Sequence, residues 1–299
     1  MTGAGGFVGR HLMRHLEEEG DEAFACDRSD GTVDILEPSQ LANLLGQVRP
    51  EVVYHLAGWS DVGGSWAAPT EVLRANVEGT LNVLTAAREA GVQRVLLVSS
   101  ADVYGAVDED SLPITEDTPL RPVSPYAVSK VAADFLGLQA WLGHGLPVVR
   151  ARAFNHLGPG QTPKFVAAAL AHRIATAEHD GTKELAIGNL SARRDFTDVR
   201  DVVRAYRLLV EAGESGEAYN VCSGEAVAVA ELADRLVALS GLDLVLVPDP
   251  TLARPVDVPV LLGDAGRLER ATGWKPEIPL DRTLADLLDE ARARVASAG

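Results

Sequence analysis

Cysteine and basic side chains are both scarce in this chain of 299 residues. Cys26 and Cys222 are the only cysteines, too few and too far apart to suggest a disulfide framework, so we expect a reducing, cytoplasmic setting. Lys and Arg number 27 against 43 Asp and Glu, which gives a net charge of −16. Because nucleic acids and anionic membranes are bound by basic surfaces, this balance argues against both as general partners.

Long apolar runs, internal repeats and low-complexity segments are missing as well. We find no run long enough to cross a bilayer and no charged-then-apolar leader, so we expect no membrane segment. What remains is an ordinary globular composition, with 46% apolar and 23% charged residues, which is sufficient for a sizeable core.

Short apolar runs alternate with helical patterns over the first two-thirds of the chain. The patterns predict strands at residues 22–27, 51–58, 92–100 and 146–154, and helices at 38–49, 70–91 and 124–142. Such alternation indicates an α/β fold, a doubly wound parallel sheet of the Rossmann type covered by helices on both faces. Ligands bind such sheets at the carboxyl ends of the strands.

Beyond residue 160 the alternation weakens. We expect helices at 164–178, 227–241 and 284–295, a strand at 242–249, and a loop at 188–202. These features predict a smaller α/β lobe for substrate at residues 161–191 and 223–299. It would interleave with a dinucleotide-binding domain at residues 1–160 and 192–222.

The opening "MTGAGGFVGR" has the glycine spacing of a dinucleotide-binding loop at Gly3, Gly6 and Gly9. Glycines permit a tight turn and a close approach of pyrophosphate to backbone N–H groups at a helix start. Asp27 ends the next predicted strand, at about the distance where an acid meets a ribose 2′-hydroxyl. An ordinary turn and a strand-end cap are the alternatives. His11 and His15 are four apart on a helix, but no further ligands stand nearby, so we expect no metal.

The segment "SPYAVSK" starts a helix, with Ser124 as the N-cap and Pro125 at the first position. Tyr126 and Lys130 then share one helical face, where an ammonium would lower the pKa of the phenol. Ser100 follows a predicted strand, where its hydroxyl can reach a substrate carbonyl. A surface aromatic–cation pair and a turn serine are the alternatives.

Together with the glycine loop, the motifs "HLAG", "SSADVYG", "SPYAVSK", "ARAFNHLGPGQ", "RRDFTDV" and "TGWKP" occur in the order found in extended short-chain dehydrogenase/reductases. The chain resembles this family over nearly its whole length. Within it, "SPYAVSK", "FNHLGPGQ" and "GNLSARRDFTDVRDVVRAY" are most similar to GDP-4-dehydro-6-deoxy-mannose reductases, which make GDP-D-rhamnose. GDP-mannose 4,6-dehydratases are close relatives.

The resemblance implies a role for each matching residue. It implies a catalytic triad of Ser100, Tyr126 and Lys130. The residues implied to bind the cofactor are Gly3, Gly6, Phe7, Val8, Gly9, Asp27, Arg28, Asp34, Ile35, Ala57, Gly58, Asn76, Ser99, Tyr126 and Lys130. Those implied to bind the substrate are Ser100, Asp102, Asn155, Arg194 and Arg254, and the two arginines would pair with the pyrophosphate. His156, next to Asn155, is a further candidate for substrate contact.

The cofactor expected from the resemblance is NAD(H), with NADP(H) as the alternative. Asp27 should repel a 2′-phosphate, while Arg28 beside it could pair with one. The substrate expected is a nucleotide-diphosphate sugar, with a GDP-sugar favoured. Family members commonly pair the helices that correspond to residues 76–90 and 126–142, so a homodimer is expected.

The alternatives to a reductase are a dehydratase or 4-epimerase of the same family, or a non-catalytic cofactor sensor. A sensor usually loses the Tyr or the Lys, and both are present. Related dehydratases place a Glu two residues before the Tyr of "VYG", and some add an Asp before it. Ala101 and Asp102 hold these positions here. Ala101 has no acid or base, and Asp102 is one methylene shorter, which favours the reductase.

The family pattern also implies that about half a dozen apolar residues should precede Thr2 as the central strand of the sheet. Only Met1 stands there. We therefore expect a natural chain that begins earlier, because without that strand two neighbouring strand edges would be exposed.

Overall fold

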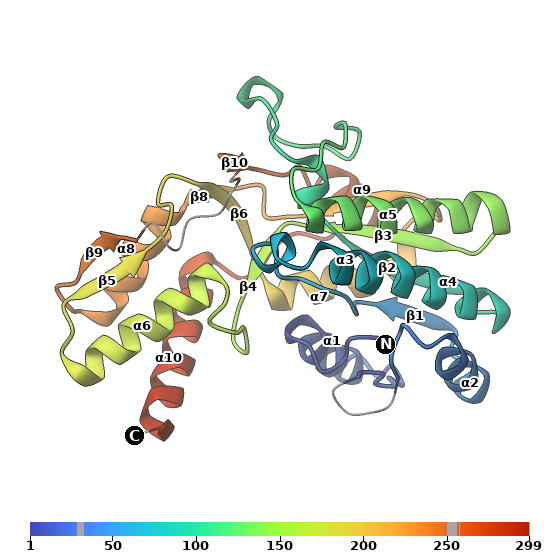
Figure 1. Cartoon of the computed structure of the whole chain (residues 1–299), viewed down its shortest axis with the longest axis horizontal. Helices are drawn as coiled ribbons and strands as arrows, with labels where there is room; N and C mark the ends of the chain where they lie inside the picture. The colour runs from blue at the N-terminus through green and yellow to red at the C-terminus, as the bar shows by residue number, and fades with distance from the viewer. Residues whose placement is uncertain (29–32, 250–255, 257, 299) are drawn as a thin grey trace.

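The computed structural model describes residues 1–28, 33–249, 256 and 258–298, and its elements form a larger and a smaller lobe (Figure 1). The larger lobe is built on a parallel sheet of four described strands in the order β1-β2-β3-β7. These strands are β1 (Val52–His55), β2 (Arg94–Ser100), β3 (Val148–Ala153) and β7 (Ala218–Val221). The doubly wound α/β fold predicted from the sequence is confirmed.

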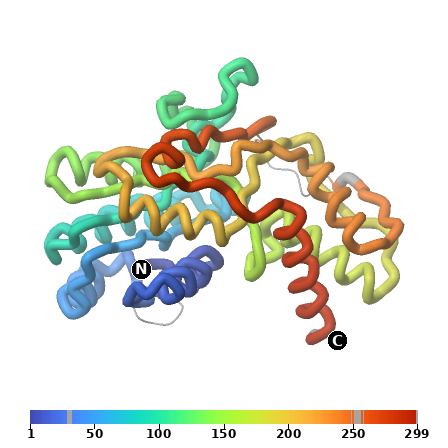
Figure 2. The backbone as a smooth tube through the Cα atoms, turned by 180° about the vertical axis from the view of Figure 1, so that it is seen from behind, coloured from blue at the N-terminus to red at the C-terminus, as the bar shows by residue number. Residues whose placement is uncertain are grey.

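Helices cover both faces of this sheet (Figures 1 and 2). One face carries α4 (Gly79–Glu89) and α5 (Pro125–His144), with α2 (Pro38–Val48) beside α4. The other face carries α7 (Val199–Ala212), flanked by α1 (Phe7–Glu18) and α9 (Gly266–Thr272). Helix α5 begins as predicted, because the Ser124 side chain accepts a hydrogen bond from Ala127 N at 3.1 Å. The two helical layers bury both faces of β2 and β3.

The first residues of the chain lie between β1 and residue 26. Thr2 forms parallel bridges to both Cys26 and His55. Thr2 N donates to Tyr54 O at 3.0 Å and Gly3 N donates to Cys26 O at 3.0 Å. This short segment reaches only the carboxyl end of the sheet. The strand predicted at 22–27 is wrong: a single parallel bridge between Cys26 and Thr2 is found in its place. That the natural chain begins earlier stays a prediction.

Two further predictions differ from the structure. The helix predicted at 70–91 is divided into α3 (Pro69–Leu73), a π-helical turn (Arg74–Glu78) and α4. The loop predicted at 188–202 instead contains β6 (Arg193–Asp198) and the start of α7. The sequence did not predict β6 as a strand, because its charged residues do not give the apolar pattern of a buried strand. Asp195 is buried because it accepts hydrogen bonds from Ser223 and from Gly224 N.

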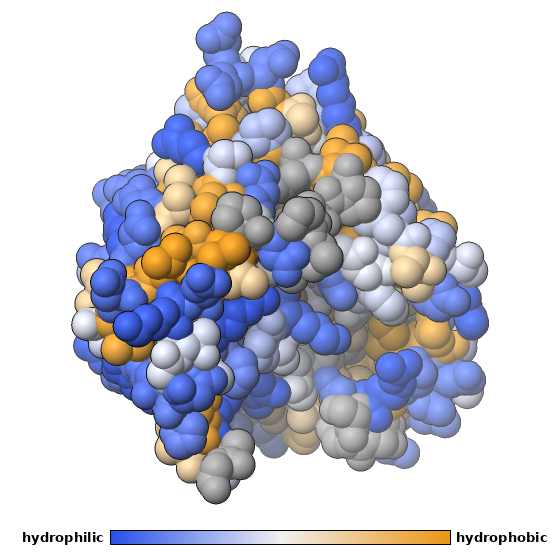
Figure 3. Space-filling view, turned by 60° about the vertical axis from the view of Figure 1, so that its left-hand side comes forward, coloured by the Kyte–Doolittle hydropathy of each residue, from blue (hydrophilic) through white to orange (hydrophobic). Residues whose placement is uncertain are grey.

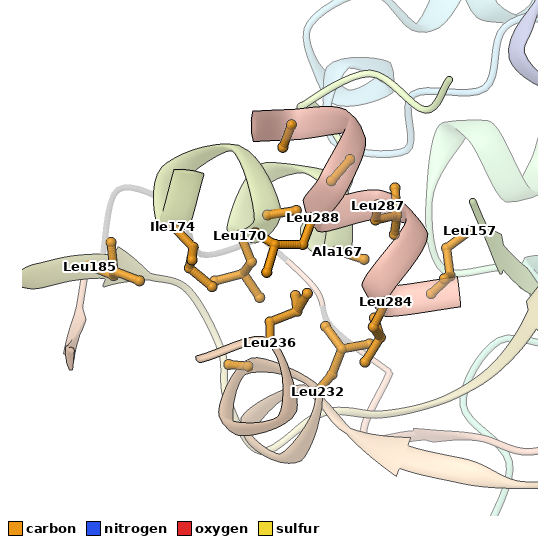
Figure 4. Packing of buried hydrophobic residues seen from close by; sticks show 14 of the residues in the cluster. Leu157, Ala167, Leu170, Ile174, Leu185, Leu232, Leu236, Leu284, Leu287 and Leu288 are labelled. Atoms are coloured by element: carbon orange, nitrogen blue, oxygen red, sulfur yellow. The ribbon is translucent and has the colours of Figure 1, made fainter. Parts of the chain in front are cut away.

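The smaller lobe joins two small sheets to three helices. One sheet has the order β10-β6-β4 with β8 on β6, and the other pairs β5 with β9. Its remaining elements are β4 (Asn155–Leu157), β5 (Glu184–Ile187), β8 (Ala226–Ala228), β9 (Val245–Pro248), β10 (Val260–Leu261), α6 (Val166–Asp180), α8 (Val229–Ser240) and α10 (Leu280–Ala298). Leucines from all three helices meet in its core (Figure 4).

Outside the smaller lobe, between β1 and α5, short 3-10 turns lie at Gly64–Trp66, Ala101–Tyr104 and Glu109–Ser111.

The chain passes between the lobes more than once. It leaves the main sheet after β3, returns through α7 and β7, and leaves again for β8. The lobe boundaries predicted from the sequence stay predictions. On the face that Figure 3 brings forward, hydrophilic side chains surround limited apolar patches, in keeping with the acidic composition.

Candidate active site

The glycine loop joins the short first segment to α1. Gly3 has φ +73°, and a Cβ there would lie 2.7 Å from Ala57 N. A Cβ on Gly9 would lie 2.1 Å from Gly3 O, so the loop packs on α1 only with glycine at this position. The first N–H groups of α1 therefore stand at an exposed turn where phosphate oxygens can approach. This cradle fits a dinucleotide pyrophosphate.

Asp27 lies at the loop, where its carboxylate accepts a hydrogen bond from Gly5 N at 2.9 Å. The Arg28 side chain is 80% exposed and lies 4.0 Å from the Asp34 carboxylate. All three residues line the same cleft as the glycine loop. Asp27 and Arg28, the acid and the base that were predicted to contact the adenosine ribose or its 2′-phosphate, thus line the same cleft.

A cleft of about 760 Å³ runs along the carboxyl edge of the main sheet toward the smaller lobe. Its size suits a cofactor together with a substrate. The predicted site residues that line it are Gly3, Gly6, Phe7, Val8, Gly9, Asp27, Arg28, Asp34, Ile35, Ala57, Gly58, Ser99, Ser100, Asp102, Tyr126, Lys130, Asn155 and Arg194. Residues separated by nearly the whole first two-thirds of the chain meet in one cavity.

The predicted triad is assembled from β2 and α5. Ser100 ends β2, and Tyr126 and Lys130 stand in the first turns of α5, which packs against β2. Lys130 Nζ donates to Val98 O at 3.0 Å and lies 6.0 Å from the centre of the Tyr126 ring. All three side chains are buried and line the cleft.

The predicted lowering of the Tyr126 pKa is wrong. Burial raises the pKa of this phenol, the Asp102 carboxylate raises it further, and a hydrogen bond with Ser100 opposes them. Lys130 is turned to Val98 O and does not offset the burial. The phenol is therefore protonated at neutral pH, the state that a proton donor needs. Burial lowers the pKa of Lys130 to about 8, although the Asp134 carboxylate opposes this shift.

Behind Lys130, Asp134 forms a buried ionic cluster. Its carboxylate accepts hydrogen bonds from Arg150 Nη1 at 2.5 Å and from Arg152 Nε at 3.0 Å. Asp134 is fully buried, and burial works against its ionisation, yet the two guanidinium groups hold its pKa below the usual range. The cluster ties α5 to β3 one helical turn beyond Lys130.

Asn76 is buried behind the cleft wall and is not among the described residues that line it. Its amide donates to Ser129 Oγ at 2.8 Å and its Oδ1 accepts from Trp59 N at 2.7 Å. It therefore links α5 to the loop after β1. His55, the first residue of the "HLAG" motif, joins Thr2 to Thr80 through its two ring nitrogens at 2.8 and 3.0 Å.

Asp102 lies beside Ser100 in the turn after β2. Ser100 Oγ donates to Asp102 Oδ2 at 3.0 Å, and Asp102 N donates back to Ser100 Oγ at 3.2 Å. The carboxylate is close enough to Tyr126 to raise its pKa. Ala101 is buried and supplies no polar side chain.

At the smaller lobe, Asn155 opens β4 and Arg194 lies on the neighbouring β6. Arg194 is mostly buried, and its Nη1 donates to Arg193 O at 2.9 Å. The second predicted arginine, Arg254, lies outside the described residues.

The loop at 155–161, whose first three residues form β4, contacts both lobes. His156 stacks on Phe7 with ring centroids 6.1 Å apart, and His11 Nε2 lies 2.7 Å from Pro159 O. Gly160 N donates to Glu290 on α10 at 2.6 Å. Since a carbonyl only accepts, His11 donates from Nε2 in this contact.

Sequence reasoning missed part of the cleft wall. The missed residues include Trp59, Asp61, Gln161, Phe165 and Tyr206. Trp59 and Asp61 directly follow "HLAG", so their position after a strand end was a usable signal. The sequence around Tyr206 contains no such signal, because Tyr206 fits the pattern as one of the apolar residues of a helix.

The described residues contain neither a membrane-spanning helix nor a cluster of metal ligands. None of their helices is long and apolar enough to cross a membrane. Within the same ranges, no group of three or more His, Cys, Asp or Glu side chains is arranged to hold a metal ion.

Known proteins are similar to this chain in sequence and in fold. The family model described as GDP-mannose 4,6 dehydratase matches residues 31–287. A Pseudomonas aeruginosa protein named GDP-6-deoxy-D-mannose reductase is 40% identical over 297 residues, which are 99% of this chain and 97% of that protein.

Two solved structures are similar throughout. One, RMD from Pseudomonas aeruginosa complexed with NADPH, has a TM-score of 0.89 at 39% identity and covers 98% of this chain and 97% of that one. The other, a UDP-glucose 4-epimerase from Thermotoga maritima with UDP-glucose, has a TM-score of 0.91 at 26% identity and covers 98% of each chain. Given the match of the family model and the 40% identity over nearly all of its length, this chain belongs to the extended short-chain dehydrogenase/reductases, in the family described as GDP-mannose 4,6-dehydratase.

Proposed function

We propose that this protein is an oxidoreductase that reduces the 4-keto group of a GDP-4-dehydro-6-deoxy-hexose to give GDP-D-rhamnose, at the expense of NADH or NADPH. The observation that carries the proposal is the 40% identity, over 99% of the chain, to a protein named GDP-6-deoxy-D-mannose reductase. The cleft supports it, because the glycine cradle and the three catalytic candidates lie in one cavity.

The nicotinamide cofactor, when bound, supplies a hydride for the carbonyl carbon. Tyr126 gives its phenolic proton to the carbonyl oxygen, so that the ketone gains one hydride and one proton and becomes a secondary alcohol. The raised pKa of Tyr126 keeps that proton available at neutral pH. Ser100 donates its one hydroxyl hydrogen to Asp102 in the structure and would turn it to the same oxygen when the ketone is bound, and Lys130 places a positive charge 6.0 Å from the centre of the phenol ring.

The turn after β2 favours reduction over dehydration. Dehydration of a 4-keto sugar needs a base for the C5 proton and an acid for the departing C6 hydroxyl. Ala101 provides neither, and Asp102 is one methylene shorter than the Glu that related dehydratases place there, which reduces its reach toward the C5 proton. A nucleotide-sugar 4,6-dehydratase or 4-epimerase is the alternative, and the description of the family model favours the dehydratase.

We infer that NADH is preferred and NADPH is also accepted. Asp27 is held at the glycine loop by Gly5 N, where its charge would repel a 2′-phosphate. The exposed guanidinium of Arg28 offsets part of this repulsion. The NADPH bound by the similar Pseudomonas structure supports the second cofactor.

Binding of the GDP-sugar is assigned to Asn155 and Arg194 in the cleft and to Arg254. Arg194 is a buried cation at the end of the cleft nearest the smaller lobe, in a protein whose net charge is −16. A guanidinium can bind a diphosphate through paired N–H donors.

The test is a product analysis with two substrates. The purified protein is incubated with GDP-4-dehydro-6-deoxy-mannose and NADH or NADPH, and separately with GDP-mannose. We expect cofactor oxidation and GDP-D-rhamnose from the first substrate and no conversion of the second. Formation of the 4-keto sugar from GDP-mannose without net cofactor turnover would show a dehydratase.

We further infer a homodimer joined through α4 and α5. Leu142, Phe135 and Val128 on α5 are 73%, 51% and 46% exposed, and Leu81 on α4 is 47% exposed. Large apolar side chains gathered on neighbouring helices mark an interface. Light scattering should give twice the chain mass, and F135D should give a monomer. L242D, at an exposed leucine of the smaller lobe, is the matched control and should leave the mass unchanged.

We place the protein in a reducing compartment, the cytoplasm. Both cysteines are buried as thiols, and burial raises the pKa of Cys222 well above its usual value, which makes it unreactive. Fractionation of the source cells would test this location.

A further inference from the structure

Tyr206 has a phenol hydroxyl that is buried and has no hydrogen-bond partner among the described residues. The side chain is completely buried, in an apolar cluster with Leu12, Leu96 and Val203. Buried hydroxyls are nearly always paired in folded proteins, so one that is not paired requires an explanation. A phenylalanine would fill the same space without an unmet polar group.

The position of Tyr206 on α7 directs its hydroxyl toward the cleft. Helix α7 begins at Val199, beside the loop at 155–161, where a Cβ on Gly158 would lie 2.7 Å from Val199 Cγ1. Side chains on a helix lean toward its N-terminus. The Tyr206 ring therefore extends from the third turn of α7 toward the carboxyl edge of the sheet, and Tyr206 lines the cleft.

Tyr206 and Tyr126 approach this end of the cleft from opposite faces of the sheet. Tyr126 is carried by α5 and Tyr206 by α7, and both helices pack on β2 and β3. Burial raises the pKa of Tyr206, and the nearby Tyr126 raises it further. Tyr206 thus lies near Tyr126 in the cleft.

The walls around Tyr206 have the chemistry of a site for a flat, largely apolar ring. Val98 and Ala153 at the ends of β2 and β3 line the same cleft. Ser99 Oγ is a second buried hydroxyl there without a partner in the described residues. An aromatic ring with a single amide substituent would cover the apolar surface and still give a hydroxyl its partner.

We propose that the Tyr206 hydroxyl is a binding contact for the nicotinamide carboxamide and donates its hydrogen to the carboxamide oxygen. The proposal rests on the proposed function, which supplies a nicotinamide cofactor. It makes Tyr206 a positioning residue, because a hydrogen bond to the carboxamide would restrict the rotation of the nicotinamide ring. Tyr206 itself transfers no proton.

The test is a binding cycle with Tyr206→Phe and two ligands, measured by the fluorescence of NADH and by calorimetry with ADP-ribose. ADP-ribose keeps the adenosine, both phosphates and the second ribose but has no nicotinamide. We expect Y206F to weaken NADH binding by about five- to twentyfold, the range for a lost buried hydrogen bond. ADP-ribose should bind to both proteins within a factor of two.

Tyr54→Phe is the matched control. Tyr54 is a buried tyrosine of the same apolar cluster but is not among the described residues that line the cleft. Y54F should bind NADH as the wild type does. The melting temperature of Y206F without ligand should equal or exceed that of the wild type, because the substitution removes an unpaired buried hydroxyl.

Each remaining outcome has one meaning. Equal NADH affinity of Y206F and wild type would overturn the proposal and leave the hydroxyl to an enclosed water. Equal losses for NADH and ADP-ribose would also overturn it, because the effect would then come from the loop or the fold. A wild type that binds ADP-ribose and NADH equally well, with no cofactor oxidation on any 4-keto sugar, would contradict the proposed function instead.

Discussion

The two ends of the cleft use the same kinds of side chain in very different surroundings. At the catalytic end, Asp134 is fully buried between Arg150 and Arg152, and Lys130 lies next to it. At the adenosine end, Arg28 is 80% exposed and pairs with Asp34 only at 4.0 Å. Water screens the second pair and not the first, so equal charges should have unequal effects. The burial of each ion pair, more than its charge, therefore determines how much that pair contributes to stability or binding.

The largest effect should come from the catalytic phenol itself. Tyr126→Phe keeps the ring and removes the proton that is delivered to the ketone. We expect turnover to fall by about a hundred- to ten-thousandfold while the dissociation constant of NADH changes little. Stopped-flow and fluorescence titration measure the two quantities. Turnover within tenfold of the wild type would show that another group donates the proton.

The next effect concerns stability. Asp134→Asn leaves two buried guanidinium groups without a charge partner and should lower the free energy of unfolding by about 3–5 kcal/mol in urea titrations. Glu231→Gln, which breaks the exposed pair with Arg235, should change it by less than about 0.5 kcal/mol. Equal effects of the two substitutions would remove the contrast between buried and exposed charge.

The pH dependence of this stability follows from the sign of the shift. Because the pKa of Asp134 is lowered by folding, its stabilisation is complete above the ordinary carboxyl value of 3.8 and is lost as the pH falls through the folded value. The wild type should therefore lose stability on acidification below 3.8, and D134N should lose less over the same range. Parallel acid curves for the two proteins would contradict this account.

A smaller effect is expected in the pH profile of catalysis. Lys130 has a pKa lowered to about 8 by burial, so its charge is present below that pH and lost above it. We expect kcat/KM for cofactor oxidation to decline above about pH 8. Because Asp134 raises this pKa, D134N should shift the decline to lower pH. A profile that stays level to pH 10 would show that the charge of Lys130 is not required.

The smallest effect should appear at the open end. Arg28→Ala should weaken NADPH binding by about two- to fivefold and leave NADH unchanged, because an exposed ion pair contributes little. Arg74→Ala, at another exposed arginine that lines the cleft, is the control. A loss of NADPH binding as large as the effect of Y126F would mean that Arg28 becomes buried when the cofactor binds.

The sequence predicted the parts of the site that depend on neighbours in the chain. The glycine loop, the Ser124 cap and the spacing of Tyr126 and Lys130 are local signals, and each lies where it was expected. The lowered pKa of Tyr126 failed because it depends on burial and on Asp102, neither of which helical spacing reveals. Strand β6 was missed because its charged residues find partners such as Ser223, which is distant in the sequence. At such positions the structure depends on contacts between residues that are distant in the sequence.

The path of the chain between the lobes determines how the protein unfolds. Neither lobe is one continuous segment, because β7 returns to the main sheet between two stretches of the smaller lobe. The loop at 155–161 adds contacts to α1 on one side and to α10 on the other. A cut between β6 and α7 therefore would not release an independent domain. The two lobes should melt in one cooperative transition, and hydrogen exchange in their cores should respond together to denaturant.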